Sequence, residues 1–438
     1  MMENLARQAA LETLQRCRRD GAWSAPAMDA AIRRYRLDGR DSALASWLCL
    51  SVLQNEAFLD WHLDRFCQKP VEKSVRDLLR LGACQLLLTD RIPEHAAVSE
   101  TVELCRKNGL SRASGLCNAV LRRLAAERTS LPEIPGKGTV SYLQLRYSHP
   151  AWLAQRLCSE RGYAFTEAFF ASNNQSPPLD IQINTLKVST GDYCRALERA
   201  EIPFEVFPAL PGCLRLDGGS VTALPGYDEG LFYVQDRAAR SAVEIAAPEP
   251  GMRVLDVCAA PGGKSFAAAI RMGGKGSVVS CDLQEKKLKR IEEGACRLGI
   301  SCVETLARDG RLFEPSWENA FDLVLCDAPC SGLGVIRKRP EIRHKTEREL
   351  AALPGIQAAI LDNVSRYVRP GGLLLYSTCT VLKAENEDRV SAFLDCHTDF
   401  RAEDFTLGAV ESCGGSYTFW PHIDGTDGFF AARLRKNQ

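Results

Sequence analysis

The feature that most constrains the fold is a regular alternation of apolar runs and helical segments in the second half of the chain. Runs of strand length lie at 252–257, 277–282, 301–305, 321–326, 371–376 and 428–434. Helical patterns fill most of the intervals, notably Lys264 to Met272, Glu285 to Leu298 and Glu347 to Val368. Such alternation is typical of a doubly wound, mostly parallel sheet. We therefore expect residues 233–438 to form a C-terminal α/β, Rossmann-like domain.

The first part of the chain follows a different pattern. Apolar residues from position 3 to about 128 recur at helical spacing, which predicts an all-α domain over 1–132. Prolines and glycines between 131 and 138 mark a linker. Leu179 to Asn184 alternates as a strand, a helix is expected at 191–200, and short strands follow near 203–206 and 230–235. Residues 140–232 are therefore expected to form a small α+β module.

Composition excludes several classes of protein. The chain has 55 basic and 55 acidic residues among 438, the balance of an ordinary globular protein. Its 18 cysteines are scattered and include no C-x-x-C pair, and only six histidines accompany them. We therefore expect no metal site and no disulfide framework, and a reduced, cytoplasmic protein. The uncharged stretch Ser42 to Asn55 is too short to cross a bilayer, so we expect no membrane segment.

The segment after the strand at 252–257 is a candidate cofactor loop. Small residues there let the backbone approach a ligand, and the following helix offers unpaired N–H groups. Although the loop ends in Gly-Lys-Ser, Cys258 stands where a phosphate-binding P-loop needs glycine, and no G-x-G-x-x-G is present. The candidate cofactor-binding residues of the loop are Cys258, Ala259, Ala260, Pro261, Gly262, Gly263 and Lys264.

Three aspartates follow further predicted strands. Asp282 ends the second strand, nineteen residues past Gly263, a spacing that suits a carboxylate binding ribose hydroxyls. Asp309 follows the third strand and Asp327 the fourth. Each could simply cap the next helix or turn. Polar groups at four successive strand ends together indicate a nucleoside cofactor pocket.

Two cysteines lie in loops after strands, where α/β sheets bind ligands. Cys330 stands in Asp327-Ala328-Pro329-Cys330-Ser331-Gly332, and Cys379 stands in Tyr376-Ser377-Thr378-Cys379-Thr380. A buried inert thiol is the default for any one cysteine. A nucleophilic thiol suits methylation at carbon 5 of a pyrimidine, because addition of a thiolate to C6 turns the ring into an enamine.

These residues resemble the RNA cytosine-C5 methyltransferases that use S-adenosylmethionine, and within them the bacterial small-subunit ribosomal RNA methyltransferase B group (the Sun/Fmu proteins). The resemblance covers nearly the whole chain. In the front part it rests on motifs similar to NusB-like RNA-binding domains, at residues 6–11, 91–98 and 118–122.

The resemblance implies roles for the candidate residues. Cys379 would be the nucleophile, Cys330 would assist product release, and Asp327 would contact both the base and the cofactor side. Cys258 to Lys264, Asp282 and Asp309 would bind S-adenosylmethionine. Residues 1–132 would then be a NusB-like RNA-binding domain, 140–232 an RNA-binding module, and 233–438 the methyltransferase domain. The expected substrate is 16S ribosomal RNA, and the expected oligomeric state is a monomer.

Three other functions remain open from the sequence. The chain could methylate cytosine C5 in another RNA, such as tRNA, or methylate an exocyclic amine. The front part alone would also suit a non-catalytic NusB-like RNA-binding or antitermination protein. A basic run after Cys330 predicts phosphate contacts for any of these RNA-binding functions, through Arg337, Lys338, Arg339, Arg343, Lys345 and Arg348.

Overall fold

The computed structural model describes residues 5–217 and 219–438. The first four residues of the predicted domain 1–132, and Gly218 of the predicted module 140–232, lie outside the described residues. The chain divides into two compact units. One contains residues up to 176 together with 336–346, and the other contains 177–335 together with 347–438. The division into three domains stays a prediction.

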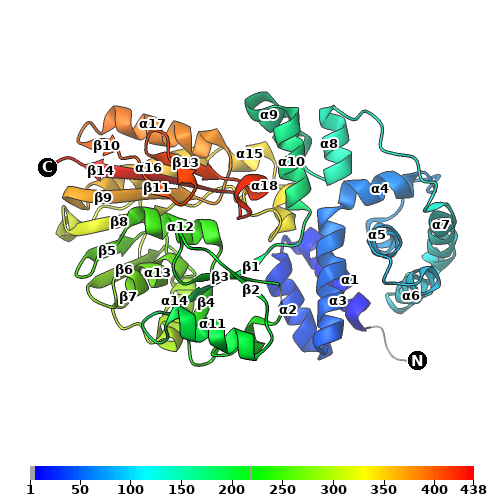
Figure 1. Cartoon of the computed structure of the whole chain (residues 1–438). Helices are drawn as coiled ribbons and strands as arrows, with labels where there is room; N and C mark the ends of the chain where they lie inside the picture. Colours follow the sequence, from blue (N-terminus) through cyan, green and yellow to red (C-terminus); the bar gives the residue numbers. More distant parts are fainter. Residues whose placement is uncertain (1–4, 218) are drawn as a thin grey trace. The chain divides into compact units, whose positions relative to one another are not determined.

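The first unit is helical, as the sequence predicts (Figure 1). Its front half contains α1 (Leu5–Asp20), α2 (Ser24–Tyr35), α3 (Gly39–Gln54), α4 (Glu56–Asp64), α5 (Lys73–Leu87), α6 (Glu94–Lys107) and α7 (Ser114–Glu127). Three more helices follow the linker, namely α8 (Val140–Tyr147), α9 (Ala151–Arg161) and α10 (Tyr163–Asn173). The short helix η4 (Pro340–His344) joins this unit from far along the chain.

The apolar spacing explains how the front helices pack. In α1, Ala6, Ala10 and Leu14 fall one turn apart, and all three are buried in one core with residues of α3 and α5. Side chains that suit helix starts stand where two helices begin. Asp38 accepts a hydrogen bond from the Asp41 amide at α3, and Thr139 accepts one from the Tyr142 amide at α8.

The second unit begins with the small α+β module. It contains β1 (Leu179–Ile183), α11 (Thr190–Arg199), β2 (Phe204–Val206), β3 (Cys213–Leu216) and β4 (Phe232–Val234). The strands form an antiparallel sheet in the order β2-β3-β1-β4. The sequence predicts every element here except β3, which has only four residues and follows a turn rich in proline and glycine. Such a short strand shows little periodicity.

The larger part of the second unit is built on one mixed sheet. Its strands are β5 (Arg253–Asp256), β6 (Ser277–Asp282), β7 (Val303–Ala307), β8 (Phe321–Asp327), β9 (Val368–Thr378), β10 (Phe400–Ala402), β13 (Ser416–Phe419) and β14 (Phe429–Lys436). The order is β10-β14-β9-β8-β5-β6-β7, with β13 also paired to β14. Strands β9, β8, β5, β6 and β7 run parallel, whereas β14 pairs antiparallel to β9. The α/β fold is therefore confirmed.

Helices cover both faces of this sheet (Figure 1). On one face lie α12 (Arg237–Ala246), α13 (Gly263–Arg271) and α14 (Glu285–Leu298), and on the other α16 (Leu353–Ser365) and α17 (Glu387–Cys396). The central strand β8 shows the consequence. Leu323 and Leu325 enter one apolar core, while Val324 and Cys326 enter the other. Because both faces are buried, the strand reads as a continuous apolar run.

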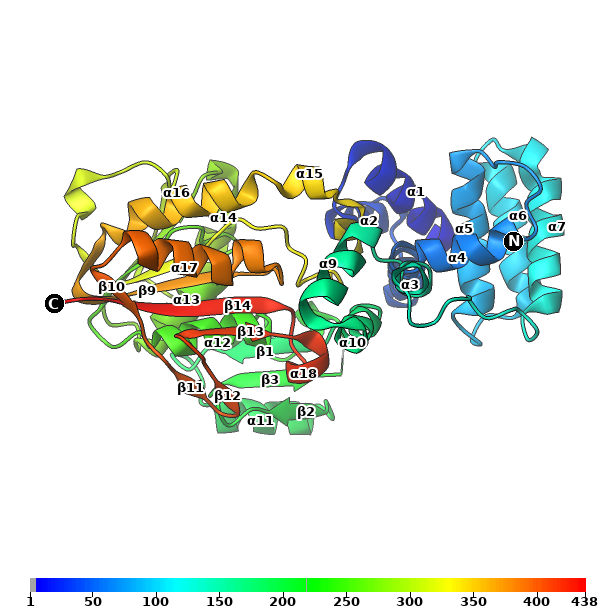
Figure 2. The ribbon, with the colours of Figure 1, turned by 90° about the horizontal axis from the view of Figure 1, so that it is seen from above.

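Two differences from the predicted elements have local causes. The predicted helix Glu347 to Val368 is interrupted, because α15 (Glu347–Leu350) ends before α16, which carries Pro354 in its first turn. Near the C-terminus, the sequence does not predict the short strands β10 and β13 at the antiparallel edge of the sheet. It also does not predict β11 (Thr406–Leu407) and β12 (Val410–Glu411), which pair with each other in a separate two-stranded sheet (Figure 2). Among the residues described, no helix combines the length and apolarity that a bilayer span requires.

Candidate functional site

The candidate residues gather at one edge of the parallel part of the sheet. Strands β5, β6, β8 and β9 are neighbours, so their carboxyl ends meet at this edge. Asp327 at the end of β8 lies opposite Ser377 of β9, which brings the two cysteine loops together. The edge of a parallel sheet at the strand ends is where such folds bind ligands.

The candidate cofactor loop joins β5 to α13. The amide of Ala259 donates to the carbonyl of Cys281 in β6 (2.7 Å), and the amide of Gly262 donates back to Ala259 (2.6 Å). Gly262 has φ +104°, and a Cβ there would lie 2.6 Å from the ring of Phe266. Only glycine therefore suits this turn. Since no side chain caps the start of α13, its first amides face the loop, as binding a polar ligand requires.

The two outer aspartates differ in their surroundings. The carboxylate of Asp282 is nearly buried and accepts a hydrogen bond from the amide of Gln284 (2.9 Å). The carboxylate of Asp309 is held by Arg311, whose Nη2 donates to Oδ2 at 2.6 Å. The hydrogen bonds from Arg311 lower the pKa of the Asp309 carboxyl, so this group stays ionised.

Asp327 forms an ion pair within the site. Nζ of Lys264 lies 2.7 Å from Oδ2, and the hydroxyl of Ser377 donates to Oδ1 at 2.9 Å. Burial alone would lower the pKa of Lys264, but the charge of Asp327 and its hydrogen bond outweigh burial and raise it. Lys264 is therefore a cation fixed at the strand ends, beside the ring of Phe429, whose centroid is 5.0 Å away.

The two candidate thiols are in contact. Sγ of Cys330 lies 3.2 Å from Sγ of Cys379, and neither cysteine forms a disulfide. The hydrogen bond to Cys379, followed by burial and the nearby charges of Glu385 and Asp327, raises the pKa of Cys330 well above its ordinary value. Cys330 is therefore a protonated thiol. The geometry permits an S–H group on Cys330 to donate to the sulfur of Cys379.

Backbone contacts fix the loop of Cys330. The hydroxyls of Ser331 and Thr380 are 2.6 Å apart, and the amide of Gly334 donates to the carbonyl of Cys379 at 3.0 Å. The amide of Gly428 donates to the carbonyl of Gly334 at 2.8 Å. A Cβ at Gly334 would lie only 1.9 Å from the carbonyl oxygen of Gly428. Glycine is therefore required where these two backbones meet.

One more carboxyl group lies at the strand ends, and the sequence analysis did not assign it. Asp256 ends β5 and is fully buried, and it accepts a hydrogen bond from the Ser265 hydroxyl at 2.7 Å. The Ser280 hydroxyl lies 2.7 Å from that of Ser265. Burial raises the pKa of Asp256 to about 7. The available signal was an aspartate within the apolar run 254–257.

The predicted phosphate contacts are wrong for two of the six basic residues. Arg337 and Arg343 are each 5% exposed, within the helical unit. The guanidinium of Arg343 donates to the carbonyls of Gln54, Tyr147 (3.0 Å) and Asn173 (3.2 Å). Burial lowers the pKa of Arg343 to about 9. These contacts bind neighbouring helix ends together, so the side chain is not presented to RNA.

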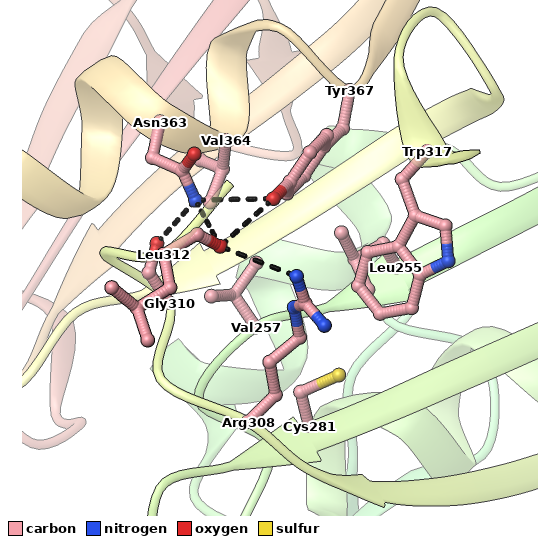
Figure 3. A pocket seen from close by; sticks show the side chains of 10 residues that line it. All are labelled: Leu255, Val257, Cys281, Arg308, Gly310, Leu312, Trp317, Asn363, Val364 and Tyr367. Atoms are coloured by element: carbon pink, nitrogen blue, oxygen red, sulfur yellow. Dashed lines mark hydrogen bonds between the residues drawn. The ribbon is translucent and has the colours of Figure 1, made fainter. Parts of the chain in front are cut away.

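A small cavity lies between the sheet and α16 (Figure 3). The carbonyl of Leu312 accepts hydrogen bonds there from Arg308 (3.4 Å), Asn363 (3.2 Å) and Tyr367 (3.1 Å). The space open to the centre of a water-sized sphere is about 10 Å³. That volume holds about one water molecule. The cavity is therefore too small for a nucleobase, and neither candidate thiol lines it.

The mixed α/β sheet with its strand-end site defines a protein of the Rossmann-like methyltransferase class. Sequence models of three families match the chain. They are described as 16S rRNA methyltransferase RsmB/F (residues 243–435), the NusB family (4–126), and an RsmF/B-like ferredoxin-like domain (149–222).

Relatives and a solved structure agree with these matches. The chain is 34% identical to the probable ribosomal RNA small subunit methyltransferase B of Synechocystis sp., over 98% of this chain and 99% of the relative. It is 32% identical to the probable enzyme of the same name from Bacillus subtilis, over 100% of both chains. The crystal structure of PH0851 is similar with a TM-score of 0.84 at 26% identity, covering 100% of this chain and 99% of that one. The chain therefore belongs to the 16S rRNA methyltransferase RsmB/F family, and the predicted resemblance is confirmed.

Proposed function

We propose that this methyltransferase transfers a methyl group from S-adenosylmethionine to carbon 5 of a cytosine in 16S ribosomal RNA, through a covalent adduct with Cys379. The observation that carries the proposal is the contact between the sulfurs of Cys330 and Cys379, 3.2 Å apart and not joined in a disulfide, next to the ion pair of Lys264 and Asp327. The names of the relatives, which are small-subunit ribosomal RNA methyltransferases, support the choice of RNA.

The strand-end residues fit the proposed cofactor. The carboxylate of Asp282 is an acceptor suited to ribose hydroxyls, and the glycine turn before α13 exposes backbone amides to polar groups. Asp309 lies after the neighbouring strand β7 and stays ionised. Bound S-adenosylmethionine would supply a methyl group on a positively charged sulfur. The loop Cys258–Lys264 and these two acids would hold it.

Asp327 would select cytosine. Its carboxylate only accepts hydrogen bonds, and two donors, Lys264 and Ser377, leave it further acceptor capacity. The exocyclic amine of cytosine is a donor, whereas uracil presents a carbonyl oxygen at that position. A carboxylate at this point therefore favours cytosine.

Cys379 then acts as the nucleophile. The Cys379 thiol gives up its proton to water, and its sulfur then bonds to C6 while the electrons of the C5–C6 double bond move to C5. C5 would then accept the methyl group that bound S-adenosylmethionine would supply. The C5 proton is released to water, the C5–C6 double bond forms again, and the bond from C6 to sulfur breaks. Cys330 assists this last step, because a protonated thiol in contact with the leaving sulfur stabilises it as a thiolate.

The test of this proposal is the Cys379→Ala variant, assayed with unmodified 16S ribosomal RNA. We expect methyl transfer to fall on the order of 10,000-fold or more, since the adduct cannot form. Wild-type enzyme should become tethered to RNA containing 5-azacytosine, and the variant should not. Cys413→Ala, at an exposed cysteine, is the matched control. Normal turnover by Cys379→Ala would refute the nucleophile assignment.

Product analysis separates this function from its rivals. Release of 5-methylcytosine supports the proposal, whereas N4-methylcytosine would indicate transfer to the exocyclic amine. Methylation of tRNA but not 16S ribosomal RNA would indicate a different substrate. We further propose that the enzyme is a cytoplasmic monomer, for which a single species of about 48.3 kDa in light scattering is the expected result.

A further inference from the structure

A buried carboxylate lies behind the two thiols, and the function proposed above does not use it. Glu385 ends the short helix η5 (Lys383–Glu385), which follows Cys379 in the chain. The residue is only 2% exposed. Burying a carboxylate is unfavourable unless hydrogen bonds compensate it. Its partners therefore indicate what the group is for.

The carboxylate of Glu385 links both cysteine loops. Its Oε2 accepts a hydrogen bond from the amide of Ser331, the residue after Cys330, at 2.9 Å. Its Oε1 accepts one from the hydroxyl of Thr380, the residue after Cys379, at 3.4 Å. The same two neighbours also contact each other through their hydroxyls at 2.6 Å. A single carboxylate therefore ties together the positions that carry the two sulfurs.

A third contact orients the carboxylate from the opposite side. Nε2 of Gln357, on α16, donates to Oε2 at 2.9 Å and also to the carbonyl of Pro329 at 3.0 Å. Gln357 is fully buried. The loop of Cys330 is thus held both through Pro329 and through Ser331. All three groups that donate to Glu385 are neutral, so its negative charge remains uncompensated by these contacts and acts on the nearby thiol of Cys330.

The next residue completes the support on the Cys379 side. Oδ1 of Asn386 accepts a hydrogen bond from the Thr378 hydroxyl at 2.5 Å, and its Nδ2 donates to the carbonyl of Thr380 at 3.0 Å. Asn386 therefore holds the residues on both sides of Cys379. Together, Glu385 and Asn386 fix the residues next to both thiols by hydrogen bonds.

We propose that Glu385 is a positioning residue for the reaction, holding Cys330 and Cys379 in contact and keeping Cys330 as the protonated partner. This inference rests on the proposed function. A glutamine would have nearly the same size but would present only one acceptor oxygen to three donors. The structure thus assigns Glu385 a role that needs the negative charge as well as the shape.

The test is Glu385→Gln in the full-length protein. With unmodified 16S ribosomal RNA and S-adenosylmethionine, we expect kcat to fall about 100-fold, because small displacements of reacting groups have effects of this size. The KM for RNA should change less than about twofold, since Glu385 is buried and does not face the RNA. A variant with wild-type kcat would overturn the proposal.

A second readout needs no RNA. The rate at which iodoacetamide alkylates Cys330, mapped by mass spectrometry across pH, reports when that thiol ionises. Loss of the negative charge in Glu385→Gln should move this curve to lower pH. An unmoved curve would overturn the charge part of the proposal. A purely structural role would lower thermal stability without moving the curve.

Two further variants complete the design. Glu244→Gln alters another nearly buried carboxylate, which pairs with Arg240 of α12 and Arg271 of α13, and it should leave kcat and the alkylation curve unchanged. Should Glu385→Gln fail to fold, the exchange Glu385→Gln with Gln357→Glu restores a carboxylate–amide pair. We expect that exchange to fold with kcat still reduced, since Ser331 loses its charged acceptor, and full kcat would contradict the proposal.

The two proposals fail separately. If wild-type protein methylates no cytosine but Glu385→Gln still shifts the alkylation curve of Cys330, the proposed function is wrong, whereas the effect of Glu385 on the Cys330 thiol stands. If wild-type protein methylates C5 and Glu385→Gln matches it in both readouts, the positioning role is wrong and the proposed function stands.

Discussion

The two units of the chain each contain a buried cation, and the two cations are held in opposite ways. In the helical unit, Arg343 donates to backbone carbonyls such as those of Tyr147 and Asn173, and burial lowers its pKa to about 9. In the α/β unit, Lys264 faces the carboxylate of Asp327, which raises its pKa. Neutral acceptors suit a cation that joins helices. A charged partner at strand ends suits a cation that works on a substrate.

Of the variants that test this contrast, we expect the largest effect from a substitution of Lys264. In Lys264→Met, Asp327 loses its counter-charge and the site loses a fixed positive group, so we expect kcat for methyl transfer to fall about 1,000-fold. Thermal stability should fall as well, because removing one partner of a largely buried ion pair leaves Asp327 without its counter-charge, so kcat is compared at a temperature where both proteins are folded. Lys289→Met, at an exposed lysine of α14, is the control. Unchanged kcat in Lys264→Met would show that the positive charge of Lys264 does not contribute to methyl transfer.

The second prediction concerns Asp256, a buried acid in the α/β unit whose protonation makes the stability of the protein depend on pH. The pKa of Asp256 is raised to about 7 by burial, whereas an unfolded aspartate titrates near 3.8. Between these two values the folded chain binds more protons than the unfolded chain, so its free energy of unfolding falls as pH rises. For a shift of this size the loss amounts to about 4 kcal/mol across the window.

Asp256→Asn should therefore flatten the decline of stability between about pH 4 and pH 7, measured by urea unfolding at several pH values. Asp404→Asn is the matched control. Hydrogen bonds from the Gly415 amide and Ser412 lower the pKa of Asp404, so its stabilising effect is present above the unfolded value and is lost only at lower pH. A wild-type slope in Asp256→Asn would show that this carboxyl is ionised in the folded protein.

The smallest of the three effects is expected at Arg343. Arg343→Met removes one hydrogen-bond donor from each of the carbonyls of Gln54, Tyr147 and Asn173, and we expect a loss of about 3 kcal/mol in the free energy of unfolding. Arg348→Met, at an exposed arginine of the same basic run, should change stability by less than about 0.5 kcal/mol. If the Arg343 variant kept full stability but bound RNA more weakly, the residue would have the phosphate role that its burial argues against.

Sequence reasoning found those features whose cause lies in neighbouring residues. The strands β5, β6 and β8 are buried on both faces, so each is marked in the sequence by an apolar run. The helix at Glu285–Leu298 has the predicted bounds. The two thiols and the aspartates follow these strands directly, and the topology then brings Cys330 and Cys379 together. Short antiparallel strands such as β3 and β11 contain too few residues to show a period.

Features that depend on residues far apart in the sequence could not be predicted from it. Arg343 looks like its basic neighbours, and it is buried only because residues about 170 to 290 positions away place carbonyls around it. Glu385 likewise looks like an ordinary acidic residue in a polar segment. Its partner Ser331 is 54 positions away, and no local pattern links the two. Charge by itself does not reveal whether a side chain faces solvent, a carbonyl or a thiol.

The meeting of Gly334 and Gly428 limits how this site could be redesigned. Their main chains touch with no side chain between them. A Cβ at Gly334 would lie 1.9 Å from the carbonyl oxygen of Gly428, and a Cβ at Gly428 would lie 2.7 Å from the Cα of Gly334. The size of the site therefore cannot be changed by substituting Gly334 or Gly428. Efforts to admit bulkier bases must reshape other boundaries, such as the aromatic ring of Phe429 beside Lys264.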